Sequence, residues 1–218
     1  MAYTTIDDPE AYFQVKLYTG TGSELVNTLD GDTDMQPDLV WVKERSDTAY
    51  HILIDAVRGV TKQLYPNSTD DEETVAEGLK SFNTDGFTLG TDADWNTSSE
   101  TYVAWCWKES ATAGFDITTW TGNATNRTIS HNLSVAPRML IIKNTSTTDN
   151  WFVYHEGMGN NTYMHLETTN AGLSPSTNQF QATTPTSSVF SIGTADGVNK
   201  NTSTIICYTF APVQGFSK

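Results

Sequence analysis

The chain has 218 residues, of which 37% are hydrophobic and only 17% are charged, and its formal net charge is −14. This length suffices for one or two domains with real cores, and the negative balance excludes binding driven by attraction to nucleic-acid phosphates. No apolar run approaches the roughly 18 residues of a membrane-spanning helix, so membrane insertion is not expected. Two cysteines are too few for a disulfide framework or a cysteine-based zinc site.

Small polar residues are abundant, and the chain contains 35 threonines, 17 serines and 15 asparagines. Threonine is β-branched and suits strands, whereas serine and asparagine suit turns. The 6 tryptophans, 9 tyrosines and 9 phenylalanines argue against disorder, which is typical of chains with few aromatics. The composition therefore predicts an all-β globular protein.

The predicted elements of the first half begin with a half-buried strand over residues 13–19, where apolar and polar side chains alternate before a glycine-rich turn. Apolar runs predict further strands over 39–43, 50–55 and 102–107. Residues 68–79 are expected to form a short helix, because Thr69 and Glu72 have the spacing of a capping box.

The second half repeats the first with an offset of 100 to 103 residues, and its predicted strands cover 139–143, 151–155 and 205–210. Four blocks recur in the same order, namely 18–22 as 120–124, 37–43 as 137–143, 87–91 as 190–194 and 101–107 as 204–210. A period this long predicts two small domains rather than a solenoid. The expected architecture is two tandem antiparallel β-sandwiches of jelly-roll or lectin-like type, residues 1–109 and residues 110–218.

The two halves differ sharply in charge. Residues 1–109 contain 21 acidic and 7 basic residues, whereas residues 110–218 contain 5 of each. Like-charged first domains repel one another, so homo-oligomer formation is expected to run through residues 110–218.

The two cysteines occupy different positions of the repeat, since Cys106 matches Thr209 and Cys207 matches Ala104. We expect their side chains to lie on opposite faces of equivalent strands, and we expect both to be free thiols.

The segment 30–34 offers a candidate metal site, because Asp30, Asp32 and Asp34 place carboxylates on alternate residues, which suits calcium. It lacks the glycine and glutamate of an EF-hand loop, and the alternative is a solvated acidic hairpin loop. Trp95 and Asn96 lie in a polar stretch and are the candidate glycan contacts, if the indole is exposed.

Motifs for catalysis do not stand out. The sequence contains neither a Gly-x-Ser-x-Gly elbow nor a phosphate-binding loop, and its four histidines lack zinc-site spacing. The sequence therefore predicts a protein that is not an enzyme and that has no cofactor other than the candidate calcium.

Several short segments of the sequence resemble a repeat domain in virion structural proteins of tailed phages, notably marine cyanophages. This domain is usually described as tail-fibre-like. They include Tyr18-Thr19-Gly20-Thr21-Gly22, Pro37-Asp38-Leu39-Val40-Trp41-Val42-Lys43, Val57-Arg58-Gly59, Asp85-Gly86-Phe87 and Tyr102-Val103-Ala104-Trp105-Cys106-Trp107. The resemblance implies a virion appendage that is made in the host cytoplasm and contacts other virion proteins.

Two functions stay open under this resemblance. One is host attachment through a cell-surface glycan. The other is a purely structural role, such as a capsid decoration, head fibre or tail adaptor protein. A glycan binder needs exposed aromatics in a concave polar site, whereas a structural component needs large matched surfaces against its neighbours.

Overall fold

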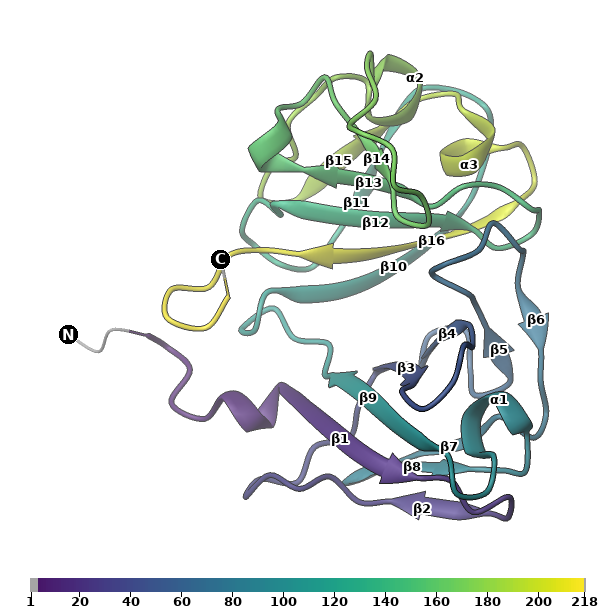
Figure 1. Cartoon of the computed structure of the whole chain (residues 1–218). Helices are drawn as coiled ribbons and strands as arrows, with labels where there is room; N and C mark the ends of the chain where they lie inside the picture. The colour runs from purple at the N-terminus through teal and green to yellow at the C-terminus, as the bar shows by residue number, and fades with distance from the viewer. Residues whose placement is uncertain (1–3, 218) are drawn as a thin grey trace. The chain divides into compact units, whose positions relative to one another are not determined.

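The computed structural model describes residues 4–217 and consists mainly of antiparallel strands, as Figure 1 shows. The predicted all-β class is confirmed. The described chain divides into two compact units. The acidic unit comprises residues 7–66 and 72–109, and the C-terminal unit comprises residues 4–6, 67–71 and 110–217.

The acidic unit is built on a four-stranded sheet and a three-stranded sheet. The larger sheet has the order β1 (Phe13–Thr19), β9 (Thr101–Trp107), β3 (Leu39–Glu44) and β4 (His51–Asp55). The smaller sheet has the order β2 (Leu25–Asn27), β8 (Gly86–Leu89) and β7 (Leu79–Asn83), and a short hairpin joins β5 (Lys62–Gln63) to β6 (Glu73–Thr74).

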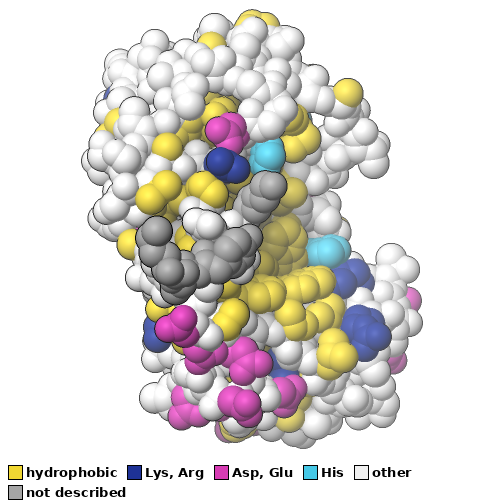
Figure 2. All heavy atoms as spheres, turned by 90° about the vertical axis from the view of Figure 1, so that its left-hand side faces the viewer, with side chains coloured by type: hydrophobic (Ala, Val, Ile, Leu, Met, Phe, Trp, Pro, Cys, Tyr) yellow, Lys and Arg dark blue, Asp and Glu magenta, His cyan; other side chains and the backbone are white. Residues whose placement is uncertain are grey.

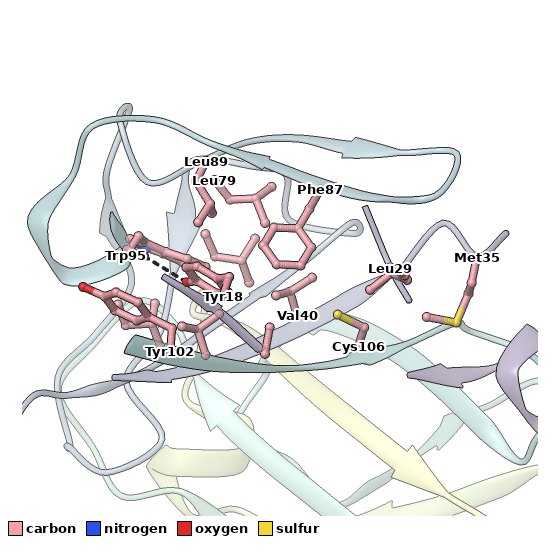
Figure 3. Close-up of a cluster of buried hydrophobic side chains, with 14 of the residues drawn as sticks. Tyr18, Leu29, Met35, Val40, Leu79, Phe87, Leu89, Trp95, Tyr102 and Cys106 are labelled. Atoms are coloured by element: carbon pink, nitrogen blue, oxygen red, sulfur yellow. Dashed lines mark hydrogen bonds between the residues drawn. The ribbon is translucent and has the colours of Figure 1, made fainter. Parts of the chain in front are cut away.

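The core of the acidic unit follows from the two-residue alternation of its strands. In β9, Tyr102, Ala104 and Cys106 are buried, while the side chains between them are partly exposed. Figure 3 shows Tyr102 and Cys106 packed with side chains from the smaller sheet, among them Leu79, Phe87 and Leu89. This burial of apolar surface is the main stabilising contribution to the unit.

The C-terminal unit is built on a five-stranded sheet and a two-stranded sheet. The larger sheet has the order β10 (Phe115–Thr121), β16 (Thr204–Phe210), β12 (Met139–Asn144), β13 (Phe152–His155) and β14 (Met164–His165). The smaller sheet pairs β11 (Arg127–Ser130) with β15 (Val189–Ile192). Its core gathers buried aromatics and aliphatics from both sheets, including Trp120 and Phe190, and also contains Phe180 from the segment 177–180.

The helices are single turns. They are the 3-10 helices η1 (Pro9–Ala11) and η2 (Glu156–Met158), and the α-helices α1 (Ala93–Asn96), α2 (Thr177–Phe180) and α3 (Asp196–Asn199). Asp92 caps α1, because its side chain accepts a hydrogen bond from the backbone N–H of Asp94 at 3.0 Å.

The helix predicted over residues 68–79 is wrong, because this stretch contains the two-residue strand β6, irregular segments and, at Leu79, the start of β7. Its local capping signal is outcompeted by tertiary contacts. The Ser68 carbonyl accepts from the Trp151 indole N–H at 3.0 Å, and Glu72 pairs with Arg58 at 3.2 Å. These contacts draw the chain into an extended course.

Both cysteines are free and buried, as predicted. The expectation that they face opposite sides of equivalent strands is wrong. Cys106 and Cys207 each lie in the core of their own unit. The matched positions differ by two residues, and a displacement of two returns a strand side chain to the same face. Burial raises the pKa of each thiol to about 12.

Candidate interaction site on the acidic unit

The Gln14 side chain fastens the acidic loop of residues 30–33 to strand β1. Its amide N–H groups donate to the Glu10 and Thr33 carbonyls at 3.0 and 2.9 Å, and its carbonyl oxygen accepts from the Gly31 N–H at 2.9 Å. A Cβ on Gly31 would lie 2.7 Å from that oxygen, so a larger residue there would displace the Gln14 side chain. The loop is therefore held in a fixed position beside the strand.

Carboxylates complete the attachment of this loop. Glu10 accepts the Asp32 N–H at 2.8 Å, and Asp8 accepts the Thr33 hydroxyl. Asp30 forms an ion pair with Lys16, although 67% of the Asp30 side chain stays exposed. These carboxylates hold the backbone of the loop and neutralise Lys16, so their role here is structural.

A groove of about 260 Å³ lies between the loop and β1, and it is lined by Glu10, Phe13, Gln14, Val15, Asp30 and Gly31. The two charged groups that line it are both acidic. No nucleophile paired with a base lines it, and because Asp30 is already paired with Lys16, the negative charge of this recess rests mainly on Glu10. Such a recess suits the binding of a cationic group.

The calcium site predicted at Asp30, Asp32 and Asp34 is not formed. Within residues 4–217, no three histidine, cysteine, aspartate or glutamate side chains come together as metal ligands. Asp30 is drawn to Lys16, and the loop follows the hydrogen bonds of Gln14 instead of wrapping around a cation. Alternating carboxylates do not converge unless the backbone coils around the ion.

The glycan contacts predicted at Trp95 and Asn96 are also wrong, because both side chains are 0% exposed. The Trp95 indole donates to the Gln63 amide oxygen at 2.9 Å, and the Trp95 carbonyl accepts the Tyr18 hydroxyl at 2.9 Å (Figure 3). Since α1 is one turn held against the core, Ala93 and Asp94 face outward, whereas Trp95 and Asn96 pack inward.

Asn96 and Asn199 make matching hydrogen bonds in the two units. The Asn96 side chain accepts from the Thr21 N–H and donates to the Gly90 and Ser23 carbonyls. The Asn199 side chain accepts from the Asn123 N–H and donates to the Gly193 and Thr125 carbonyls. Each asparagine thus fixes the loop that follows the first strand of its unit.

The signal for this burial is present in the sequence. Gly90-Thr91 is followed by Trp95-Asn96, and Gly193-Thr194 is followed by Val198-Asn199 at the same spacing. Trp95 therefore matches Val198, which is also 0% exposed. Extending the repeat alignment by five residues would have predicted both tryptophan and asparagine as internal.

Lys143 is the most deeply placed cation of the C-terminal unit, with 0% exposure. Its ammonium group donates to the Asp149 and Thr69 carbonyls at 2.6 and 2.9 Å, and it lies 6.0 Å from the centroid of the Trp151 ring. Burial lowers its pKa to about 8. All the neighbours that bond it are backbone carbonyls, so Lys143 holds segments together.

A second groove, of about 510 Å³, lies in the C-terminal unit and is lined by Thr4, Thr5, Ala111, Thr112, Val135, Pro212, Val213 and Gln214. None of these side chains is ionisable. The lining offers no group for acid–base or nucleophilic chemistry.

The exposed part of β1 is a surface feature that the sequence pattern did not predict. The strand was expected to be half-buried through the alternation of its apolar and polar side chains, but its buried side is reversed, because the polar Gln14 is buried together with Tyr18. Its other side leaves Val15 44% and Leu17 56% exposed. The sequence signal was the pair of aliphatic residues at the positions that alternate with this buried set.

The family model for a domain of unknown function, DUF7483, matches residues 8–218. The chain therefore belongs to the DUF7483 family. Searches of curated proteins and of solved structures found no match to this sequence. Within the described residues, no helix has the length and apolar character needed to cross a membrane.

Proposed function

We propose that the chain is a non-enzymatic structural protein of a phage virion, built from two tandem β-sandwich domains of one repeated design. The sequence resemblance to tail-fibre-like repeats supports the virion assignment. One observation carries the proposal. The polar residues that match between the two units, Asn96 and Asn199, are buried and hold loops in place, so what the units share is a structural role and not a reactive group.

The strand pairings support the tandem design. The orders β1-β9-β3-β4 and β10-β16-β12-β13 match strand by strand along the chain. Trp41 lies opposite Trp105, and Ile141 lies opposite Tyr208 at the matched positions of the second sheet. Ser46 and Ser146 accept hydrogen bonds from the backbone N–H groups of Thr101 and Thr204, at 2.8 and 2.9 Å.

A structural role is favoured over attachment to a host glycan. Glycan stacking needs an exposed aromatic ring beside polar groups, and the residues suggested for it, Trp95 and Asn96, are enclosed. The exposed hydrophobic side chains include the aliphatic pair Val15 and Leu17 and one aromatic ring, Tyr50, on the unit that carries most of the carboxylates. We therefore assign the chain to virion assembly, with other virion proteins as its partners, whether as a capsid decoration, a head fibre or a tail adaptor.

The test is to purify intact particles of the phage that encodes the chain and to measure the protein content by quantitative mass spectrometry. The expected result is that the chain is present at a copy number compatible with virion symmetry. Electron microscopy of particles with an epitope tag then locates it on the head or the tail. Absence of the chain from washed particles that contain the other structural proteins would overturn the proposal.

A further inference from the structure

Among residues 4–217, strand β1 pairs only with β9 and therefore forms an edge of its sheet. Flanking the strand, the Gly20 N–H donates to the Glu100 carbonyl and the Lys108 N–H donates to the Tyr12 carbonyl. Antiparallel hydrogen-bonded pairs alternate along a strand. The even-numbered residues therefore bond to β9, and the main-chain groups of Val15 and Leu17 point away from the sheet.

The side chains at this edge are also open. Val15 is 44% exposed and Leu17 is 56% exposed. Natural proteins protect such edges with charged side chains, proline, bulges or a covering segment. Lys16 lies between these two residues. Its side chain points to the other face of the strand, where it forms an ion pair with Asp30. A seven-residue edge with two bare aliphatic side chains is a ready template for an added strand.

The matching edge in the C-terminal unit, β10, is partly closed. Ser110 and Phe115 exchange both of their main-chain hydrogen bonds there, and the Thr121 carbonyl accepts from the Arg127 side chain at 2.9 Å. Ile117, which matches Val15, is only 6% exposed, and Thr119 stands where β1 has Leu17. The open apolar edge is thus a property of β1 and not of the repeated framework.

We infer that β1 binds an extended, basic segment of another protein, which adds to the sheet as a fifth strand. Apolar residues at alternate positions of that segment cover Val15 and Leu17. A lysine or arginine at its end beside Phe13 enters the groove that Glu10 and Asp30 line. Figure 2 shows acidic side chains gathered on the acidic unit next to exposed hydrophobic ones.

Charge decides between this occupant and a second copy of the chain. The first 109 residues contain 21 acidic and only 7 basic residues, so two acidic units repel when their β1 edges approach. A cationic strand is attracted by the same field. The inference rests on the proposed assembly role only for the source of the segment, which would be another virion protein, and its test uses the purified chain alone.

The probe is a fluorescein-labelled ten-residue peptide in which valine and threonine alternate, with two lysines at its C-terminal end, titrated against the full chain by fluorescence anisotropy. Saturable binding is expected, and it weakens as salt screens the charges. Hydrogen exchange of the Val15 and Leu17 amides is expected to slow by roughly tenfold or more in the complex. Peptides with glutamates in place of the lysines, or with N-methyl groups on the amides that face β1, are expected to bind roughly tenfold more weakly.

Two variants identify the edge. Leu17→Pro removes an outward N–H without breaking a bond to β9, and Thr119→Pro makes the same change on the β10 edge as the matched control. Leu17→Lys places a repelling charge at an exposed position, so it remains informative if the proline variant unfolds. Each Leu17 variant is expected to weaken binding roughly tenfold, whereas Thr119→Pro leaves it unchanged.

The outcomes separate the alternatives. Peptide binding that is equal for wild type and Leu17→Lys would overturn the inference, as would the absence of saturable binding at low salt. A doubling of mass by light scattering that Leu17→Lys abolishes would assign the edge to a second copy instead. Presence of the chain in virions together with a failed peptide titration would reject the strand-addition site and leave the proposed function standing.

Discussion

Asn96 and Asn199 illustrate how single polar side chains define this fold. Each is 0% exposed and uses its amide to satisfy two carbonyls and one N–H of neighbouring loops. A buried asparagine without such partners would be costly, and with them it specifies one loop geometry. The abundance of asparagine in the sequence indicated turn-forming residues. Asn96 and Asn199 are instead buried, and they hold neighbouring loops through hydrogen bonds.

Replacing either asparagine is expected to destabilise the unit that contains it. Asn96→Ala leaves the Gly90 carbonyl buried without its partner, so we expect a loss of about 2–4 kcal/mol in the free energy of unfolding. Asn199→Ala should cost a similar amount. Urea denaturation measures both, and the exposed Asn170→Ala is the control, with a change within about 0.5 kcal/mol. Changes that small for Asn96→Ala would show that the loop hydrogen bonds are dispensable.

Lys143 gives the C-terminal unit a pH dependence of unusual sign. Burial lowers its pKa from 10.5 to about 8. Between these values the unfolded chain binds a proton that the folded chain has released, so the free energy of unfolding rises with pH in that window. Below pH 8 both states are protonated and the slope vanishes.

Denaturation of wild type and Lys143→Met at pH 7.5 and 9.5 measures this contribution. The wild-type stability is expected to gain up to about 2 kcal/mol relative to the variant over this interval. Lys43→Met, at the matched and partly exposed position of the other sheet, controls for the loss of a lysine. Parallel pH profiles for wild type and Lys143→Met would contradict the prediction.

At the scale of elements, the turn after β4 is organised by a buried ion pair. Arg58 contacts the Asp55 carboxylate at 2.7 Å, and the Asp55 side chain is fully buried. Arg58 also reaches Glu72 at 3.2 Å, which brings the start of β6 toward β5. Gly59 follows with a φ of +99°, a conformation that favours glycine.

Removing one partner of this pair is expected to cost more than removing both. Arg58→Met leaves the Asp55 charge uncompensated, for an expected loss of about 3–5 kcal/mol, and Asp55→Asn combined with Arg58→Met should recover part of it. Lys80→Met breaks the exposed pair with Glu77 and should change stability by less than about 1 kcal/mol. Additive losses in the double variant would argue that the pair is not coupled.

Strands were predictable from the sequence because their periodicity is local. Residues 13–19 and 102–107 match β1 and β9 closely. The helix at 68–79 was not, because a capping box competes there with Arg58 and Trp151, which lie far away in sequence. The calcium and glycan sites failed for a related reason: Gln14 and Gln63 decide where Asp30 and Trp95 face, and neither glutamine is adjacent in the chain.

At the scale of the whole molecule, the uneven charge separates the responses of the two units to salt. Repulsion among the carboxylates of the acidic unit weakens as the Debye length falls from about 10 Å at 0.1 M to about 3 Å at 1 M. We expect added sodium chloride to raise the thermal midpoint of the acidic unit by a few degrees. The midpoint of the C-terminal unit should change less.

Differential scanning calorimetry of the full chain at low and high salt makes the comparison. Asn96→Ala identifies the transition of the acidic unit by lowering its midpoint selectively. A salt-induced shift confined to the other transition would show that charge repulsion does not limit the stability of the acidic unit.

Residues 67–71 belong to the first half of the sequence but pack as part of the C-terminal unit. This segment leaves the acidic unit and supplies the Ser68 and Thr69 carbonyls that bind Trp151, Lys143 and the Asp149 N–H of the C-terminal unit. A gene exchange with its breakpoint at residue 109 would replace the donors without the acceptors. Replacing residues 110–218 alone is therefore expected to disturb the packing of residues 67–71, whereas replacing both halves together keeps these contacts.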